Sequence, residues 1–580
     1  MKKNRLPGIA ARLMTVALAI AASGYAQGNS NPPDKSQATF RTTTRLVVVD
    51  VVAVNGKGEP LTDLKPEEFT VSENGKLQEV KSFSLHQPLP ANARTEPSPA
   101  APLPPGEFSN APRYKNAAVW NIILLDFLNS QVLSQADMRD RLAKVLDKMP
   151  DDPVAVYVLT DRLHLLHDFS SDQAALKAAV AALKNKASAH IDNPKGGHEA
   201  ERYPPPILAA MTPEQLAAVL HSEAQATGFN TQLRLRLTME ALNMIVRNVA
   251  ALPGRKNLIW ISQAFPFSID PGQTVKATDA ATGMDFSVSV PGTANALLDG
   301  EVAIYPVDPL GVTGSDEFDV AGRGKDAIGL PETNVGPTNT VSELRYAQNA
   351  THASLNNLAD STGGRAFYNR NDLGDAVLQS MRDGDTFYTL AYYPSDKNWN
   401  GKFRRISVKV ARAGVKLRHR SGYFALDPGV HDAPAARAEA VALFRQALDL
   451  ETPVATSLLF HARVRPPAPA QEKLIVELQL EPGAITTDAG PDNHQHVSVD
   501  CAVAVFTEKG APVTLTGNTV SGPLKPEGFE KVAREGFPCR VGLDLPPGSY
   551  LLRLGIHDNL SGRMGTANAN VSIPEKTHPQ

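Results

Sequence analysis

The spacing of apolar residues changes twice along the chain, and these changes predict three regions. Between residues 41 and 86, β-branched runs such as Val47–Val54 alternate with Asn-Gly turns, which predicts β-hairpins. Between residues 114 and 383, short continuous apolar runs at 118–126, 154–159, 257–262 and 302–307 alternate with segments of helical spacing. Such runs predict parallel strands that are buried on both faces and connected by helices. From residue 384 onward the pattern is again that of strands.

The two β regions on either side of the α/β region each lack a partner sheet. The hairpin unit 41–86 is too small to be stable alone, because one or two hairpins are only marginally stable in water. We therefore expect 41–86 and 384–425 to form the two halves of one β-sandwich. Residues 87–113, rich in Pro and Ala, are expected to be a linker, 426–452 a helical linker, and 453–575 a second β-sandwich.

The predicted fold class is therefore α/β plus all-β. A doubly wound parallel-sheet domain at 114–383 is inserted in a β-sandwich and followed by a C-terminal β-sandwich. Long polar segments at 266–297 and 310–345 interrupt the α/β pattern and are expected to be disordered or functional loops.

The N-terminus has the pattern of a secretory signal peptide, residues 1–26. Basic residues at positions 2–5 precede an apolar stretch at 13–22, and Gly24 and Ala26 provide the small residues that a signal peptidase reads. An uncleaved anchor helix is the alternative, but the apolar stretch is short for a membrane span. Residues 27–40 are polar and expected to be disordered. We expect a secreted, periplasmic or cell-envelope protein with no transmembrane segment after cleavage.

The charge balance argues against nucleic-acid binding. The 580-residue chain has a formal net charge of −3, and since residues 1–26 contribute four positive charges and no negative one, the remainder is more acidic still. A nucleic-acid binder needs a basic face over the phosphates. With 42% hydrophobic and 21% charged residues the composition is that of a globular protein, which excludes disorder of the whole chain.

One acidic residue occupies a position that is suited to ligand binding. In an open parallel sheet, ligands bind at the carboxyl ends of the strands, near the point where the strand order reverses. The first apolar run ends in Asp126, and the polar residues Asn129 and Ser130 follow it. Oxygen ligands of this kind can hold a hard cation. The alternative is that Asp126 is a buried, hydrogen-bonded residue that closes the loop.

Several segments together carry a resemblance to a known family. The chain resembles a von Willebrand factor type A domain and, more closely, the VWFA-related family described from acidobacteria. The resemblance covers about residues 41–425. Its segments are 46–52, 63–69, 124–126, 254–262, 358–367, 392–394 and 418–424. The resemblance implies the type A-like fold for the α/β region and a role in adhesion or assembly at the cell envelope.

The resemblance also implies a magnesium site, which is degenerate in this sequence. Type A domains hold the ion with an Asp-x-Ser-x-Ser loop, a threonine and a second aspartate, and a partner protein adds a carboxylate. Asp126 matches the first aspartate and Ser130 the second serine, whereas Leu128 stands at the first serine. Ser170 or Ser171 would take the place of the threonine, and no aspartate follows the 257–262 run. Mg²⁺ or another divalent cation is therefore expected to bind weakly, if at all.

Two further features remain open. Cys501 and Cys539 are the only cysteines and would be able to form a disulfide in an oxidising compartment, although the sequence does not show how close they lie.

We expect a non-enzymatic protein that binds an unknown envelope protein through the strand-end loops of the type A-like domain. The alternatives are a structural envelope component and a hydrolase of envelope polymers. The candidate catalytic acids of that hydrolase are Asp299, Asp308, Asp316 and Asp319.

Overall fold

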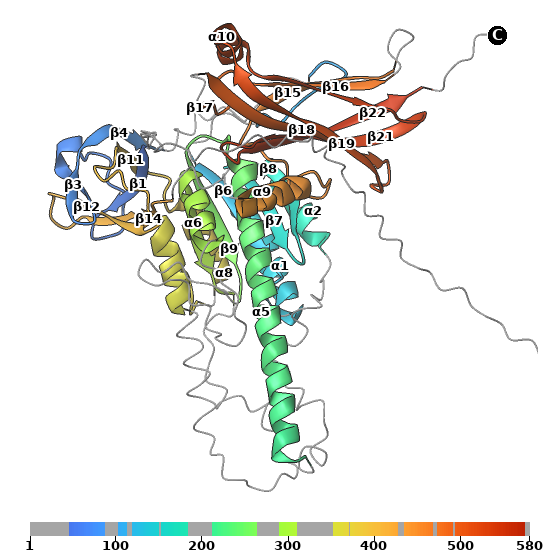
Figure 1. Cartoon of the computed structure of the whole chain (residues 1–580). Coiled ribbons are helices and arrows are strands. Elements are labelled where there is room, and N and C mark those ends of the chain that lie inside the picture. Colours follow the sequence, from blue (N-terminus) through green and yellow to red (C-terminus); the bar gives the residue numbers. More distant parts are fainter. Residues whose placement is uncertain are drawn as a thin grey trace, which may run out of the picture. The chain divides into compact units, whose positions relative to one another are not determined.

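Figure 1 shows the computed structural model of the protein. The structure describes residues 46–87, 103–112, 119–130, 132–149, 152–183, 211–263, 289–309, 352–370, 372–426, 434–467, 473–490 and 494–574. The expected signal peptide 1–26, the segment 27–40 and the polar segment 310–345 lie outside these residues, as does most of the polar segment 266–297.

The α/β region contains a five-stranded sheet with the order β10-β9-β6-β7-β8. Its strands are β6 (Val119–Asp126), β7 (Val154–Leu159), β8 (Leu163–Ser170), β9 (Arg255–Ile261) and β10 (Val302–Val307). The first four in the order are mutually parallel, and β8 is antiparallel to β7. The sheet is thus mixed, and the expectation of a wholly parallel sheet is wrong. Only residues 160–162 separate β7 from β8, which is too short for the crossover that a parallel connection requires.

Helices cover both faces of this sheet. They are α1 (Val132–Leu146), α2 (Gln173–Ala181), α5 (Pro213–Val249), α6 (Ser289–Asp299), a helix over 352–362 and α8 (Leu373–Arg382). Alternate residues of β6 enter two different apolar clusters, Ile122 with side chains of α5 and α6, and Ile123 with side chains of α1, α2 and α8. Because successive strand residues point to opposite faces, the two clusters lie on the two faces of the sheet.

Two glycines after the helix over 352–362 are required by the geometry. Gly363 has a φ of +79°, a conformation that side chains with a Cβ rarely adopt. A Cβ on Gly364 would lie 1.9 Å from the carbonyl oxygen of Ile304 in β10. The pair lets the chain leave the helix and pass directly against the sheet.

Strands on both sides of the α/β region in sequence pair with one another in two four-stranded sheets. The sheet orders are β13-β1-β11-β4 and β14-β12-β2-β3. The strands before it are β1 (Val47–Val54), β2 (Phe69–Glu73), β3 (Lys76–Gln78) and β4 (Val80–His86). Those after it are β11 (Phe387–Tyr392), β12 (Phe403–Val410), β13 (Lys416–His419) and β14 (Gly422–Phe424). A single apolar cluster contains inward side chains from both sets of strands.

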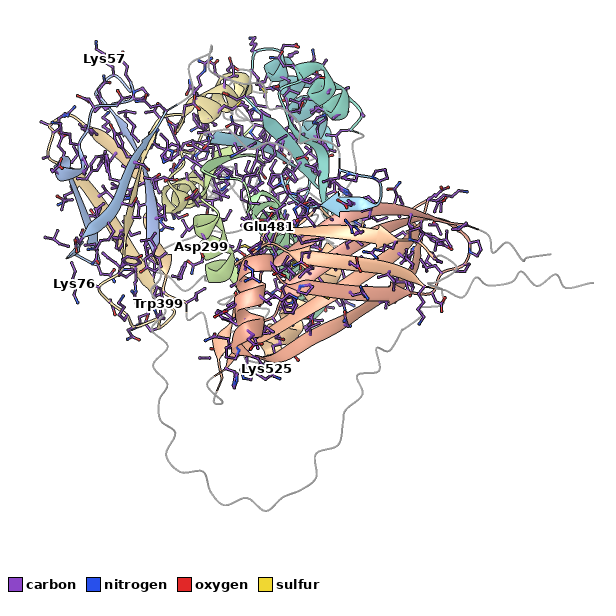
Figure 2. All side chains as sticks on the ribbon, turned by 90° about the horizontal axis from the view of Figure 1, so that it is seen from above. Lys57, Lys76, Asp299, Trp399, Glu481 and Lys525 are labelled. Atoms are coloured by element: carbon purple, nitrogen blue, oxygen red, sulfur yellow. A yellow bond between two sulfur atoms is a disulfide. The ribbon has the colours of Figure 1, made fainter. Side chains whose placement is uncertain are left out.

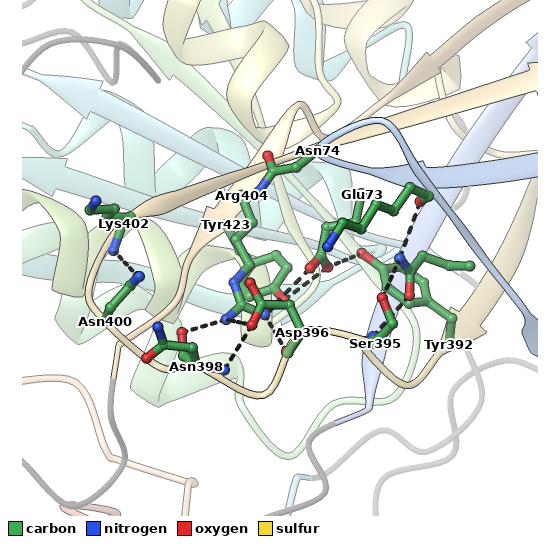
Figure 3. Close-up of polar contacts among 12 residues, drawn as sticks. Glu73, Asn74, Tyr392, Ser395, Asp396, Asn398, Asn400, Lys402, Arg404 and Tyr423 are labelled. Atoms are coloured by element: carbon green, nitrogen blue, oxygen red, sulfur yellow. Dashed lines mark hydrogen bonds and ion pairs between the residues drawn. The ribbon is translucent and has the colours of Figure 1, made fainter.

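A buried polar network lies among these strands (Figure 3). The carboxylate of Glu73 in β2 is 3.4 Å from the guanidinium of Arg404 in β12, and both side chains are almost fully buried. Tyr392 and Tyr423 donate their hydroxyl hydrogens to Glu73 Oε2, at 2.8 and 3.0 Å. Arg404 also donates to the backbone oxygen of Asp396, at 2.7 Å. The buried charges are therefore paired and hydrogen-bonded, which offsets the cost of removing them from water.

The C-terminal region contains two further sheets. One has the order β20-β16-β15-β5, and the other has the order β17-β18-β21-β22 with β19 paired to β18. The strands are β15 (Phe460–Arg465), β16 (Leu474–Leu480), β17 (Asp488–Ala489), β18 (Gln495–Thr507), β19 (Pro512–Leu524), β20 (Pro538–Leu543), β21 (Gly548–Asp558) and β22 (Met564–Ile573). One apolar cluster joins inward side chains of both sheets.

Three elements here differ from the sequence pattern or refine it. Strand β5 (Glu107–Ser109) lies within the range expected to be a linker and pairs with β15. A strand of three residues is too short to show a period, so only its partner reveals it. Helix α10 (Pro526–Glu535) interrupts a region that was expected to contain only strands. Helix α9 (Pro434–Ala447) lies within the expected helical linker.

Candidate functional site

The expected site centres on Asp126, the last residue of β6, at the carboxyl ends of the parallel strands. Its neighbours in the sheet are β7 and β9, so Asp126 lies where the strand order reverses. The side chain is fully buried, and so is the following loop, whose residues 127–130 are at most 3% exposed. Asp126 and this loop are therefore not part of the surface that the described residues offer to a partner protein.

Four hydrogen bonds from the protein itself satisfy the Asp126 carboxylate. The backbone N–H of Asn129 donates to Oδ1 at 2.9 Å. Oδ2 accepts from the Asn129 side-chain amide, from Trp260 Nε1 and from Ser262 Oγ, each at 2.9 Å. Trp260 and Ser262 come from β9 and the residue after it. The Asn129 amide also donates to Thr238 Oγ1 on α5, at 3.1 Å. Asp126 thus ties the loop after β6 to β9 and, through Asn129, to α5.

These groups do not fit a divalent cation. A cation needs oxygen lone pairs directed at it, whereas the indole N–H, the amide and the hydroxyl hydrogen all point at the carboxylate. Burial raises the pKa of Asp126 above its usual value, against the opposing effect of the bonds from Asn129, Trp260 and Ser262. Burial lowers the pKa of Arg234 on α5, and the negative charge of Asp126 opposes this effect. The arrangement is that of an internal anchor, the alternative reading of Asp126 given by the sequence.

The structure does not bring the four expected ligands together. Ser130 is buried in the loop after Asp126, where its Oγ accepts from the backbone N–H of Gln263 at 3.3 Å. Ser170 ends β8, which is antiparallel, and it pairs with Val154 at the start of β7. Asp126 instead pairs with the last residue of β7, five residues further along that strand. Ser170 and Ser171 thus lie toward the opposite end of the strands, displaced from Asp126 by roughly 16 Å along the strand direction at about 3.3 Å per residue.

The expectation that Ser170 or Ser171 would replace a ligating threonine is therefore wrong, because it assumed that every strand of the sheet runs the same way. Ser170 Oγ accepts from the backbone N–H of Asp172, whose carboxylate caps the N-terminus of α2. This is a local role in starting the helix. Among the described residues, no group of three or more His, Cys, Asp or Glu side chains is placed to hold a metal ion.

Two of the four acids expected for a hydrolase, Asp299 and Asp308, lie among the described residues. Asp308, just after β10, lies 3.9 Å from His352 Nε2, and His352 stacks on Tyr368 with 4.1 Å between ring centroids. At that separation the contact is an ion-pair spacing and not a hydrogen bond. Asp299 ends α6, and Asp316 and Asp319 lie outside the described residues.

Cys501 in β18 and Cys539 in β20 form a disulfide, with Cα atoms 6.6 Å apart. The bond joins the two sheets of the C-terminal region. Both cysteines are buried within the apolar cluster between those sheets.

One surface feature was not expected from the sequence, namely the exposed edge strand β19. Figure 1 shows it beside β18 in the same sheet as β21 and β22. Its range, 512–524, contains no charged residue, and that gap was visible in the sequence. The gap became meaningful only when the pairing showed that this strand lies at an edge.

No helix among the described residues is both long enough and apolar enough to cross a membrane.

Comparison with known proteins finds no matching family model and no matching curated protein. Among solved structures, the chain is similar to the conserved hypothetical protein BatB from Bacteroides thetaiotaomicron, with 13% identity, 46% of this chain and 98% of that chain covered, and a TM-score of 0.23. It is also similar to the ArnB paralog VWA2 from Sulfolobus acidocaldarius, with 8% identity, coverage of 87% and 76%, and a TM-score of 0.20. The pilus adhesin SpaC from Lactobacillus rhamnosus GG gives 8% identity, coverage of 85% and 58%, and a TM-score of 0.25. At these TM-scores the likenesses carry no argument about this chain.

Proposed function

We propose that this protein is an exported, non-enzymatic component of the cell envelope that binds a partner protein by strand addition at the edge of β19. The observation that carries the proposal is the free edge of this long strand. The secretory pattern of residues 1–26 and the Cys501–Cys539 disulfide support export, because disulfides persist in oxidising compartments.

The edge of β19 offers a row of backbone N–H and C=O groups with which another extended chain can pair. β19 is 13 residues long and, among the described residues, pairs with β18 alone. In an antiparallel ladder every second residue directs its N–H and C=O away from the paired side. All but three of the residues of β19 are exposed, so this row of groups is accessible to a partner strand.

The usual protections of an edge strand are weak in β19. Proteins blunt such edges with charged side chains, short strands or a covering segment. No charge occurs from Pro512 to Leu524, and the next charged residue is Lys525, labelled in Figure 2. Pro512 and Pro523 stand only near the two ends. The middle of the strand is therefore open to pairing.

The opposite edge of the same sheet makes a useful comparison. β22 is also free of charge, but the segment 455–458 covers the start of its edge. There Leu458 N–H donates to the Met564 oxygen at 3.0 Å, and Thr566 N–H donates to the Ala455 oxygen at 2.9 Å. The fold thus protects part of one uncharged edge and leaves the other open.

Apolar side chains are exposed on both faces of β19. Leu515 is 44% exposed beside Ala504 of β18, and Val520 is 36% exposed beside Val499. Ala504 belongs to the cluster under α9, whereas Val499 belongs to the cluster between the sheets, so the two exposed residues lie on opposite faces. A strand added beside β19 would cover both side chains, which adds apolar burial to the backbone hydrogen bonds.

Site-specific photo-crosslinking in cells that produce the protein tests this proposal. A photo-reactive residue at position 515 or 520 is expected to give one adduct of the same mass with an envelope protein. The matched control is Val441 on α9, which is 39% exposed and should give no such adduct. With the photo-reactive residue at 520, Leu515→Lys should lower the adduct yield about tenfold, because a charge on the edge opposes strand pairing. No adduct at either β19 position, or equal adducts at all three, would overturn the proposal.

A further inference from the structure

The outer face of the sheet β20-β16-β15-β5 carries a hollow of about 570 Å³. Its lining includes charged side chains from all four strands, whereas the inner face of the same sheet is apolar and buried. This face belongs to the sheet opposite β19, and none of the lining residues is part of β19.

Charges alternate across the four strands in register. Glu107 of β5 stands opposite Arg463 of β15, which stands opposite Glu477 of β16, which stands opposite Arg540 of β20. Ion pairs of 2.6 Å join Arg463 to Glu107 and Arg540 to Glu477. Arg465 adds a third guanidinium, 2.8 Å from the second oxygen of Glu477. The face therefore holds three guanidinium groups against two carboxylates.

The arginines keep N–H donors that the ion pairs with Glu107 and Glu477 do not use. Each guanidinium has five N–H donors, and both oxygens of Glu477 already accept from an arginine. The side chains of Arg463 and Arg540 are 55% and 69% exposed, so a ligand can reach them. A ligand that supplies carboxylate oxygens would accept hydrogen bonds from these N–H groups in the bidentate geometry that guanidinium favours.

The chemistry of the hollow favours a polypeptide over a glycan. Sites for sugars and nucleotides usually offer an exposed aromatic face for stacking. The aromatic residue that lines this hollow, Phe108, packs against the apolar cluster between the sheets. The other side chains on this face of the sheet are the charged residues above, the imidazole of His461 and the amide of Gln479.

We propose that this hollow binds an acidic segment of a partner protein, with carboxylates paired to Arg463 and Arg540. Exposed ion pairs are individually weak and screened by salt, so binding should require several acidic residues and should weaken as salt rises. The site is separate from β19, and the proposal does not depend on strand addition there.

Fluorescence anisotropy of the mature full-length chain with a labelled hexaglutamate peptide tests the proposal. The wild type is expected to bind the peptide, and Arg463→Gln/Arg540→Gln to bind it at least about tenfold more weakly. The matched control is Arg141→Gln, because Arg141 forms a partly exposed ion pair with Asp137 within α1, and neither residue lines the hollow. This variant and Leu515→Lys in β19 should bind as the wild type does. Raising the salt should weaken binding in every protein that binds.

Four outcomes would overturn the proposal, and the fourth comes from a charge control. The first is equal binding by the wild type and the double arginine variant, measured in protein whose unfolding midpoint is unchanged. The second is loss of binding in Leu515→Lys, which would assign the peptide to β19. The third is binding of a sulfated oligosaccharide with no binding of the peptide, which would assign the hollow to an anionic glycan. A labelled hexalysine peptide serves as the charge control, and binding as tight as that of hexaglutamate would also overturn the proposal.

Discussion

Ser262 donates a hydrogen bond of 2.9 Å to Asp126 Oδ2, across the neighbouring parallel strands β6 and β9. The resemblance to type A domains implied a second acidic ligand after this strand, and the structure has a hydroxyl donor there. One carboxylate with donors around it is an anchor, whereas two carboxylates would repel each other without a cation between them.

The anchoring role predicts a large loss of stability in Asp126→Ala. The substitution leaves the Trp260 indole N–H and the Ser262 hydroxyl buried without their acceptor. We expect the free energy of unfolding to fall by about 3 to 5 kcal/mol in urea titrations. Ser171→Ala is the control, since this exposed residue lies toward the opposite end of the strands from Asp126. Its effect on the free energy of unfolding should stay within about 0.5 kcal/mol. Equal effects of the two substitutions would contradict the anchor.

Divalent cations are expected to leave the stability of the protein unchanged. A ligand at about 100 times its dissociation constant would add about 2.7 kcal/mol to the folded state. That gain would raise the midpoint of thermal unfolding by several degrees. We expect the midpoint with millimolar Mg²⁺, Mn²⁺ or Ca²⁺ to agree with that in a chelator within about 1 °C. A rise that disappears in Asp126→Asn would show that the carboxylate does bind an ion.

The Glu73–Arg404 pair predicts strong coupling between two buried charges. Arg404→Met should lower the free energy of unfolding by about 3 to 5 kcal/mol, because the Glu73 carboxylate is left buried without its cation. Glu73→Gln combined with Arg404→Met should recover part of this loss. Arg412→Met, which removes a partly exposed pair with Asp63 and Glu68, should have a smaller effect. A double-mutant cycle measures the coupling, and additive effects would argue against it.

The disulfide between Cys501 and Cys539 is expected to stabilise the C-terminal sandwich. The cysteines are 38 residues apart in sequence. Closing a loop of that length removes enough entropy from the unfolded chain to add about 4 kcal/mol. Cys501→Ala/Cys539→Ala should lose about that amount in urea titrations. The unreduced wild type should show no free thiol in a thiol assay under denaturing conditions. A free thiol, or an unchanged stability in the double variant, would contradict the pairing.

Glu301 predicts a dependence of stability on pH. Burial, and then the charge of Asp50, raise the pKa of Glu301 above its usual value of 4.5. The neutral carboxyl therefore favours the folded state. Its contribution is complete below pH 4.5 and is lost as the pH rises through the folded-state pKa. The stability of the wild type relative to Glu301→Gln should accordingly be greatest near pH 4 and decline toward neutral pH.

Urea titrations between about pH 4 and pH 8 measure this difference. Glu68 provides a control of opposite sign, because hydrogen bonds from the Lys65 backbone and from Arg412 lower its pKa. Its contribution is present above pH 4.5 and is lost as the pH falls through the lowered pKa. The Glu68→Gln difference should therefore move the other way, and parallel curves for the two variants would contradict the assignment. His86 and Lys256 also act on Glu301, so both need to stay unchanged in these proteins.

Much of the element pattern was predictable from local spacing. The buried runs at 154–159 and 302–307 are β7 and β10, because a strand buried on both faces must be continuously apolar. The Asn74–Gly75 turn between β2 and β3 was equally visible, since both residues take the positive φ that such a turn requires. Strand β5 and helix α10 were missed, because three residues carry no period and a helix inside a β region has no distinctive boundary.

The candidate site was predictable only in part. The sequence identified Asp126 at the end of a buried strand, and its two readings, metal ligand or buried anchor, could not be separated without its neighbours. Trp260 and Ser262 lie far from Asp126 in sequence, and only the parallel pairing of β6 with β9 brings them to it. Ser170 and Ser171 were misplaced for the same reason, because strand direction is a property of pairing.

By itself, the sequence determined most of the strands and helices and the faces that the long apolar runs bury, because periodicity follows from the geometry of a single element. Tertiary structure alone decided the direction of β8, the donors around Asp126 and the free edge of β19. Each of these depends on which strand lies beside which. A strand of uncharged residues has the same sequence whether it lies in the middle of a sheet or at its edge, and only the missing neighbour makes it a surface for a partner.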